Sequence, residues 1–433
     1  MNTYIIALEL FLFAFSFFIL LTKGEMALLY LPVVFFCDTV TDNHFITAFA
    51  YYAIISVILL KLVSTNQDFL KNNYFSGLLV LYFIILMTKA TNLAPVRSDV
   101  FNVIWYFSAL PLIVSIYKKH SKNEIFKELA NSCFLILSIF IISVLASTYF
   151  KYNPYEMYGI TGGLLYGNLY ATDFNIIAPS IFILLLYSLN KRNYLFLLVT
   201  VISLVFICLS MRRSVMAMTG LGVVIVTFLY LSKNVKKILP FTAAAVVFVF
   251  IVVFKTDFAA SMQERYELRN LEERGLDEEQ RYFEYRLLYD DVFHYKRYSP
   301  WIGFNLFNSP GNYGGGKFYD RSLHGDITSI GHSSGLIGIA LYFIMVFSAF
   351  YTAWKATENR YDKLIVLFCA IAFTSYCLTG RFTQVGCMMM LFLVANLSVA
   401  KEVPVPELVP YEEKEDDPFL LKPVMLRDSY LQN

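Results

Sequence analysis

Three residues that can take part in proton transfer lie close together where a polar stretch of the chain enters an apolar one. His324, Asp326 and His332 belong to the sequence HGDITSIGHSS, which leads directly into GLIGIALYF. An ionisable side chain at or inside a membrane costs free energy, so each is a candidate functional residue. An unperturbed imidazole, with a pKa of about 6.5, can accept a proton near neutral pH. The position suits a reaction between a molecule anchored in lipid and one dissolved in water.

The two histidines are not equivalent candidates. They are eight residues apart, which on a helix beginning at His324 is about 80° of rotation and two turns. His332 would then lie deeper, and we expect it to be a hydrogen-bonded structural residue. A catalytic zinc site needs three well-placed protein ligands, and this spacing does not match H-x3-H. We therefore predict that His324 is a general base, and we expect neither a metal nor a cofactor.

Arginines form the second group of candidates. Arg212 and Arg213 stand in a short connection between two apolar runs, and Arg281, Arg286 and Arg321 lie in the long polar interval from 255 to 327. A guanidinium group is always charged and matches phosphate oxygens with two parallel hydrogen bonds. Arg212 and Arg213 could therefore clamp a phosphate. The alternative for the pair at 212 and 213 is binding to lipid headgroups at the membrane surface.

The composition places these residues in a membrane protein. Hydrophobic residues make up 58% of the 433, and charged residues only 16%, whereas soluble domains carry roughly 25% charge. The net charge of +2 comes without a dense stripe of Lys and Arg, which excludes a nucleic-acid partner. The six cysteines show no CxxC or CxxH spacing, so we interpret them as small core residues. The apolar N-terminal run lacks a basic n-region, and we expect it to be a retained helix.

The apolar runs set the fold class, because a bilayer requires roughly 20 apolar residues per helix. A shorter apolar piece, Met26–Cys37 with Pro32 inside it, could be re-entrant or interfacial. The prediction is an all-α polytopic membrane protein with about 12, or 13, transmembrane helices and one large periplasmic loop containing amphipathic helices. The runs are 3–22, 44–63, 74–90, 99–117, 129–150, 171–189, 194–210, 215–231, 238–254, 328–352, 362–380 and 385–399.

Lys and Arg in the short loops predict the orientation. Most of them fall on alternate loops, which marks that side as cytoplasmic. The predicted organisation is a first bundle at 1–254, a periplasmic loop at 255–327, C-terminal transmembrane helices at 328–400 and a cytoplasmic tail at 401–433. The proline and charge content of the tail predicts disorder.

The periplasmic loop contains two amphipathic patterns. In the second, DEEQRYFEYRLLYDDVFHYKRY, the residues Tyr282, Tyr285, Tyr289 and Val292 recur at helical spacing. We expect this stripe to pack against the bilayer surface or the bundle, with Arg281 and Arg286 able to face inward. The glycine-rich run GNYGGGKFYDRSLH that follows is a lid over a cleft or a simple linker.

Several of these segments together resemble the O-antigen ligase and polymerase superfamily. PWIGFN followed by HGDITSIGHSSGLIGIALY resembles its periplasmic-loop-to-helix motif, with eleven residues from His324 to Gly335. MRRSVMAMTGLG is similar to its arginine-serine segment, which aligns Arg213 and Ser214, and GGLLYGNLYATDF is similar to its Gly-Asn segment. Arg286 occupies the place of the family's second arginine. The resemblance covers about residues 160 to 350 and the hydropathy layout.

The resemblance implies a glycosyltransferase with the membrane-embedded C-type architecture, in the bacterial inner membrane with its site facing the periplasm. It implies a surface-polysaccharide polymerase that takes a glycan from an undecaprenyl-pyrophosphate carrier and transfers it to a sugar hydroxyl. His324 would be the base, and Arg213 and Arg286 would hold the pyrophosphate without a metal. The implied partners are the lipid-linked donor, the glycan acceptor, membrane lipid, a chain-length regulator and a flippase. Further substrate contacts are expected from Arg212, Arg281, Arg321, Asp326 and His332.

Three other functions stay open at this point. The protein could be an O-antigen ligase that transfers the glycan to lipid A core. It could be a flippase or other transporter, although the sequence shows none of the internal repeats typical of transporters. It could also be a peptidoglycan-type polymerase, in which a loop carboxylate such as Asp290 or Asp291 would replace histidine as the key residue.

Overall fold

Helices form nearly all of the structure, which is a computed structural model. It describes residues 3–41, 45–90, 93, 97–152, 165–167, 169, 171–210, 212, 214–230, 280–304, 306–316, 322–379 and 385–401, all within the unit Met1–Lys401. The predicted run 238–254, the predicted disordered tail, and Arg213 and Arg321 lie outside these residues. No strand occurs in the described part.

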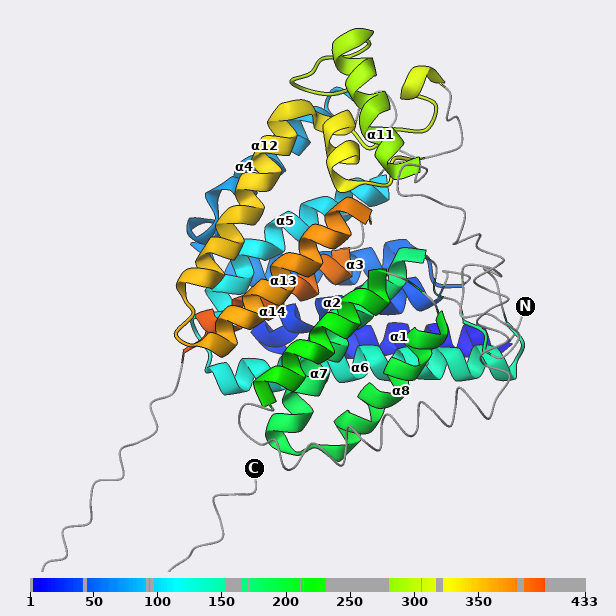
Figure 1. Cartoon of the computed structure of the whole chain (residues 1–433), viewed down its shortest axis with the longest axis vertical. Coiled ribbons are helices and arrows are strands. Elements are labelled where there is room, and N and C mark those ends of the chain that lie inside the picture. The colour runs from blue at the N-terminus through cyan, green and yellow to red at the C-terminus, as the bar shows by residue number, and fades with distance from the viewer. Residues whose placement is uncertain are drawn as a thin grey trace, which may run out of the picture. The chain divides into compact units, whose positions relative to one another are not determined.

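Every predicted apolar run within the described residues coincides with a helix, which confirms an all-helical polytopic membrane protein. Six described helices are long and apolar enough to cross a bilayer. The count of twelve spans and the periplasmic side of the loop stay predictions. The helices are α1 (Thr3–Thr22), α2 (Ala27–Thr41), α3 (Ala48–Thr65), α4 (Tyr74–Met87), α5 (Arg97–Tyr117), α6 (Lys122–Tyr149), α7 (Ile177–Lys191), α8 (Tyr194–Ser210), Ser214–Tyr230, α11 (Gln280–Tyr289), α12 (Asp326–Lys355), α13 (Arg360–Thr379) and α14 (Val385–Ala395); Figure 1 labels most of them.

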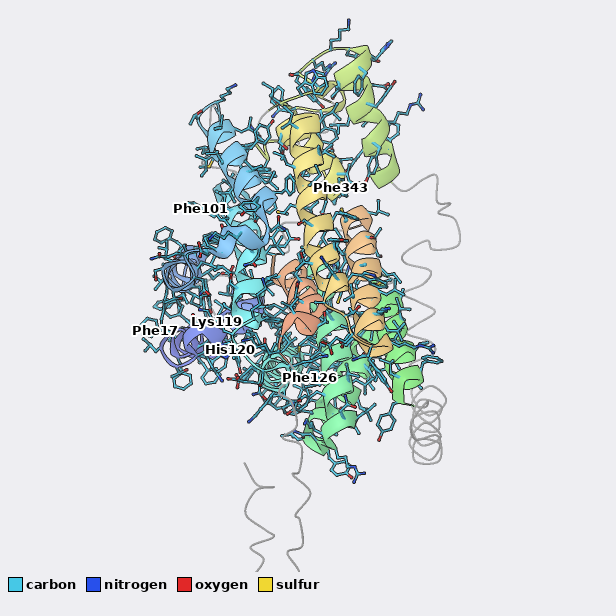
Figure 2. All side chains as sticks on the ribbon, turned by 90° about the vertical axis from the view of Figure 1, so that its left-hand side faces the viewer. Phe17, Phe101, Lys119, His120, Phe126 and Phe343 are labelled. Carbon is cyan, nitrogen blue, oxygen red and sulfur yellow. The ribbon has the colours of Figure 1, made fainter. Side chains whose placement is uncertain are left out.

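Large apolar side chains also cover the outer surface of the helices. Phe17, Phe101 and Phe343 are exposed, and Figure 2 labels all three on the surface of the bundle. A water-soluble domain rarely exposes so much contiguous apolar surface. These faces are therefore suited to contact with lipid.

Lysines of the connection between α5 and α6 contact acidic residues from other loops at one end of the bundle, which we call the lysine end. The Lys119 ammonium lies 2.7 Å from Glu25, which also accepts a hydrogen bond from Asn66 at 3.3 Å. Lys122 pairs with Asp362 at 3.0 Å, and Figure 2 shows Lys119 in this region. The loops after α3, after α5 and before α13 therefore lie together, as the alternation of basic loops predicts, and the loop before α2 joins them.

The short piece at 26–37 forms most of helix α2, which lies inside the bundle. Its side chains from Met26 to Cys37 are buried against α1, α3, α6 and α14. It begins beside Glu25 at the lysine end, and the chain beyond it returns to α1, where Phe45 N–H donates to Glu9 at 2.9 Å. An interfacial helix would expose one face, so the interfacial alternative is wrong. Neighbouring helices take the place of lipid around this short segment.

Helix α12 is broken at Gly335, where the sequence predicts one uninterrupted run. Gly335 has φ 65° and ψ −164°, which divides α12 into a first limb (326–334) and a second limb (336–355). The second limb folds back along the first, because Ile339 Cδ1 lies 3.0 Å from the position of a Cβ on Gly331. Asp326 is likewise within electrostatic reach of Tyr342, although a straight helix would separate them by about 24 Å. Figure 1 shows the two limbs in yellow.

The loop that contains PWIGFN enters this break and satisfies its backbone groups. The N–H of Leu336 donates to the carbonyl of Pro300 at 2.8 Å, and the N–H of Phe304 donates to the carbonyl of His332 at 2.7 Å. The Leu336 N–H and the His332 carbonyl would otherwise lack partners, because they stand at the ends of the two helical limbs. Broken helices are tolerated at membrane depth only with such protein partners. The motif therefore holds the hairpin formed by the two limbs.

Candidate active site

A buried carboxylate holds His324 at the start of the first limb of α12. Glu284, on α11, is 1% exposed and accepts hydrogen bonds from the His324 N–H at 2.9 Å and from Thr328 Oγ1 at 3.3 Å. Its other oxygen lies 3.1 Å from His324 Nδ1. A carboxylate that accepts several hydrogen bonds at a helix N-terminus is stabilised in its charged form. Glu284 therefore ties α11, the preceding loop and α12 together at one point.

This contact decides which ring nitrogen of His324 can react. A carboxylate only accepts hydrogen bonds, so Nδ1 is the nitrogen that carries the proton. In the neutral ring, Nε2 is then the proton acceptor. The imidazole is 34% exposed, which leaves room for a substrate hydroxyl to approach. The arrangement is that of an oriented general base.

The same contact occupies the positive end of the first limb. Helix N-termini attract anions, including phosphate, but here Glu284 already receives the His324 N–H and, at 3.5 Å, the N–H of Gly325. A phosphate at this site would have to find other donors. Side-chain donors such as arginine would suit that task.

Asp326 enters the interior of the bundle rather than the exposed side of His324. It is fully buried, interacts with the thiol of Cys377 and lies within electrostatic reach of Cys387, Tyr106 and Tyr342. These residues come from α5, α13, α14 and the second limb. In this structure Asp326 holds the N-terminal end of the first limb in place. Its contact with substrate stays a prediction.

His332 sits one turn before the break, enclosed by aromatic rings. It is fully buried, with ring centroids of Tyr298 at 5.3 Å, Phe304 at 5.5 Å and Tyr313 at 6.4 Å. Its Nε2 is 3.5 Å from the carbonyl of Asn312. These contacts join the loop to α12. They leave no exposed face through which a substrate could reach the ring.

The structure does not bring the described arginines together around His324. Arg212 lies over the ring of Phe174, 5.3 Å from its centroid, in the short helix η4 (Ala171–Ile176). Arg286 is exposed on α11, about 200° around the helix from Glu284, so the inward orientation is not observed. Arg213, Arg321 and the side chain of Arg281 lie outside the described residues, and the roles of all five arginines stay predictions.

Glu284 is the residue that the sequence analysis missed. The buried face of α11 and the turn after it contains Glu284, Leu287 and Asp291, at the helical spacing i, i+3 and i+7. The predicted stripe lies one or two residues further along the chain than these buried positions, and Tyr289 within that stripe is 62% exposed. Alignment of the two acidic residues with Leu287 was the available signal.

Asp291 has a different environment, inside the loop. It is buried, accepts a hydrogen bond from the Gly314 N–H at 2.6 Å and pairs with Arg297 Nε at 3.4 Å. Burial raises the pKa of the Asp291 carboxyl above its usual value. Gly314, Gly315 and Gly316 all have positive φ, a conformation that aims successive N–H groups at an anion. Asp291 thus anchors the glycine turn, which argues against Asp291 as the key carboxylate of the peptidoglycan-type alternative.

Together these features define a helical membrane protein in which Glu284 orients His324 at the N-terminal end of the broken helix α12. Residues 198–343 match the family model described as O-antigen ligase. The match covers most of α8, the helix Ser214–Tyr230, α11, the loop, the first limb of α12 and the start of its second limb, with Glu284 and His324 inside it. It confirms the predicted resemblance to the O-antigen ligase and polymerase superfamily. No curated protein matches the chain.

Proposed function

We propose that this protein is an O-antigen-type surface-polysaccharide polymerase in the bacterial inner membrane. It transfers a glycan from an undecaprenyl-pyrophosphate-linked donor to the hydroxyl group of an acceptor sugar. The reaction takes place at the periplasmic face and uses no metal. The match to the O-antigen ligase family supports a ligase- or polymerase-type activity on lipid-linked glycans. A chain-length regulator and a flippase are proposed as its partners.

The observation that carries the proposal is the pairing of His324 with Glu284. The 3.1 Å contact at Nδ1 orients the ring, and Glu284 stabilises the positive charge that forms when Nε2 takes a proton. An oriented base of this kind typically contributes about 10² to 10⁴ in rate. It acts where a hydroxyl group must lose a proton, which is the chemistry of the acceptor sugar.

The proposed step is a displacement at the anomeric carbon of the donor. The acceptor oxygen forms the new bond to that carbon, and its proton passes to His324 Nε2. The bond from the carbon to the pyrophosphate oxygen breaks, and its electron pair leaves with the lipid pyrophosphate. Arg213 and Arg286 are proposed to hold this leaving group and to balance its growing negative charge. Arg212 and Arg321 are proposed to assist, together with Arg281.

The test uses purified protein and an undecaprenyl-pyrophosphate-linked repeat unit. We expect wild-type protein to give a ladder of products, and His324→Ala and His324→Gln to lose about 10² to 10⁴ in rate. His294→Gln is the control, because His294 is an exposed histidine of the same loop. Folding of each variant is checked by thermal unfolding in detergent. Near wild-type polymer from His324→Gln would remove the catalytic role of His324.

A ligase is the second candidate, favoured by the description of the matching family. A ligase would use the same base and the same donor, but its acceptor would be lipid A core. Offering both acceptors to the purified protein separates the two functions. A ladder on the lipid carrier identifies a polymerase, and a single transfer to lipid A core identifies a ligase.

A further inference from the structure

A cavity of about 160 Å³ lies at the lysine end, between the last turns of α7, the last turns of the helix Ser214–Tyr230 and the start of α13. Tyr361 of α13 lines it, and the next residue, Asp362, pairs with Lys122 at 3.0 Å. That ion pair places the cavity at the lysine end. None of the residues that line the cavity belongs to the candidate active site.

The three helices pack tightly further into the bundle and leave the cavity where they end. A Cβ on Gly222 would lie 3.3 Å from the side chains of both Phe182 and Phe368, whose rings stack with centroids 4.1 Å apart. Nearer the lysine end, the Tyr361 hydroxyl donates to the carbonyl of Leu229 at 3.3 Å, beside the cavity. Protein interiors are close-packed and leave few voids larger than a water molecule. In a membrane, lipid can fill a space of this kind.

The lining combines an apolar wall with one cation. Leu186, Leu189, Val226 and Leu229 supply the aliphatic wall, and Arg192 supplies the positive charge. No acidic residue is among the described residues that line the cavity. The partner that fits both parts is amphipathic, with an apolar chain and an anionic head.

Arg192 stands in an unusual backbone position for a charged residue. It ends α7 with φ 56° and ψ 40°, a left-handed conformation that helix ends usually give to glycine or asparagine. A cation complements the negative end of a helix, but Lys191 in the last turn already does so. Arg192 is exposed and makes no ion pair within the described part of the structure. Its guanidinium group is therefore available to a ligand.

We propose that this cavity holds one anionic phospholipid, with its phosphate on Arg192 and an acyl chain along the aliphatic wall. A guanidinium group matches phosphate oxygens with two parallel hydrogen bonds. Basic pockets between membrane helices bind acidic headgroups, and anionic lipids give the cytoplasmic leaflet its negative surface potential. The lysine end is predicted to face that leaflet. The proposal goes beyond the proposed function and does not depend on it, because it concerns the end of the bundle defined by Lys122 and Asp362 rather than the His324 site.

Lipid binding can be measured on the purified full-length protein without any transfer reaction. Native mass spectrometry compares phosphatidylglycerol with phosphatidylcholine of the same acyl chains. Wild-type protein should bind the first phosphatidylglycerol at least about 10-fold more tightly, and this lipid should raise the Tm in detergent. Inorganic phosphate at the same concentration should leave the Tm unchanged. Equal affinity for the two lipids would overturn the proposal, as would an equal rise in Tm with inorganic phosphate.

Arg192→Asn tests the phosphate contact. Asparagine tolerates the left-handed backbone, so the Tm without lipid should match wild type, while phosphatidylglycerol should bind about 10-fold more weakly. Lys151→Asn is the matched control, because Lys151 is also an exposed cation with φ 55°. It follows the far end of α6, a helix of 28 residues that begins at Lys122. Lys151→Asn should bind as wild type does. Equal affinities for the two variants would reduce the site to general attraction of anionic lipid.

Leu189→Trp tests the apolar wall. The larger side chain should fill the cavity and weaken phosphatidylglycerol binding by about 10-fold, and Leu189→Phe replaces it if the tryptophan variant unfolds. Leu198→Trp is the control, because Leu198 is exposed on the outer side of α8. It should keep wild-type affinity. A folded Leu189 variant that binds phosphatidylglycerol as wild type does would place the lipid elsewhere. Such a result would leave the proposed polymerase untouched, since no arm of the experiment measures transfer.

Discussion

Gly335 lies directly against the backbone of Trp301 in the break of α12, and no Cβ atom fits between them. Gly303 faces the break from the loop, where a Cβ would lie 2.6 Å from the carbonyl oxygen of His332. Both glycines have positive φ. The hairpin can therefore close over the loop only because these two residues lack side chains.

Gly335→Ala should destabilise the protein strongly. Its φ and ψ belong to a region that non-glycine residues occupy at a cost of about 1–3 kcal/mol, and the clash with Trp301 adds to this. Gly220→Ala is the control, since a Cβ at Gly220 meets nothing within 4 Å and alanine favours helix by about 1 kcal/mol. Thermal unfolding in detergent should show a lower Tm for Gly335→Ala and an equal or higher Tm for Gly220→Ala. Equal values for Gly335→Ala and wild type would contradict the fold of the break.

The sequence was sufficient to predict where the helices lie along the chain, but not that α12 folds back on itself. An apolar run reveals composition, and the run at 328–352 has the same hydropathy whether α12 is straight or folded at Gly335. Glycine alone does not mark a break, because Gly331 and Gly338 lie within the limbs of the same helix. The decisive partner is the loop at Pro300 and Trp301, which is remote in sequence.

The site was predictable only in part for a related reason. His324 stands out because it follows a long polar interval and precedes an apolar run. Glu284 lies in a segment with many charged residues, and the local pattern predicts that each of them is exposed to solvent. Its burial arises from the packing of α11 against α12, which no local pattern contains. Arg286 shows the converse, since its spacing suggested an inward side chain that the structure exposes.

Glu284→Gln should lower activity more than stability. Glutamine can still accept hydrogen bonds at the start of α12, but it cannot stabilise the charged His324 ring as a carboxylate does. We expect loss of a large part of the 10²- to 10⁴-fold contribution of a general base, with a change of about 1 kcal/mol in stability. Transfer from the lipid-linked donor and thermal unfolding are measured on the same preparation.

The control for Glu284 is another hydrogen-bonded carboxylate far from the site. Glu128 accepts hydrogen bonds from Lys23 at 2.8 Å and Tyr30 at 2.6 Å near the lysine end. Glu128→Gln should lower the unfolding temperature and keep its activity per folded molecule. Full activity in Glu284→Gln would show that the carboxylate has no part in the reaction.

His332→Ala should act through stability rather than chemistry. Removing a ring packed among Tyr298, Phe304 and Tyr313 leaves a cavity, and such truncations typically cost a few kcal/mol. Abundance in the membrane and Tm should fall, while the rate per folded molecule stays within a few-fold of wild type. A variant with normal Tm and the activity loss of His324→Ala would instead make His332 catalytic.

Asp291 should make stability depend on pH in a defined direction. Its pKa is raised by burial in the folded protein, so the folded form binds that proton more tightly than the unfolded form. This contribution is complete below the ordinary aspartate value of about 3.9 and is lost as pH rises through the raised pKa. Asp291→Asn cannot ionise, yet it keeps an acceptor for Gly314. The difference in Tm between wild type and Asp291→Asn should be larger in favour of wild type near pH 4.5 than near pH 7.5. These pH values lie roughly one and four units above the ordinary pKa of aspartate. The opposite trend would show that Arg297 dominates the environment of Asp291.

The lysine end should face the cytoplasm, and the loop that holds His324 should face the periplasm. The expectation rests on the bias of Lys and Arg toward cytoplasmic loops and on the contacts of Lys119 with Glu25 and of Lys122 with Asp362, which bring three loops to one end. Cys208 is the one exposed cysteine among the six, so labelling begins from Cys208→Ser. In that background Lys71→Cys, exposed near the lysine end, should resist a membrane-impermeant thiol reagent in intact cells. Tyr295→Cys, exposed in the loop, should react, and both should react after permeabilisation. Reaction of Lys71→Cys alone in intact cells would reverse the orientation and place the His324 site on the cytoplasmic side.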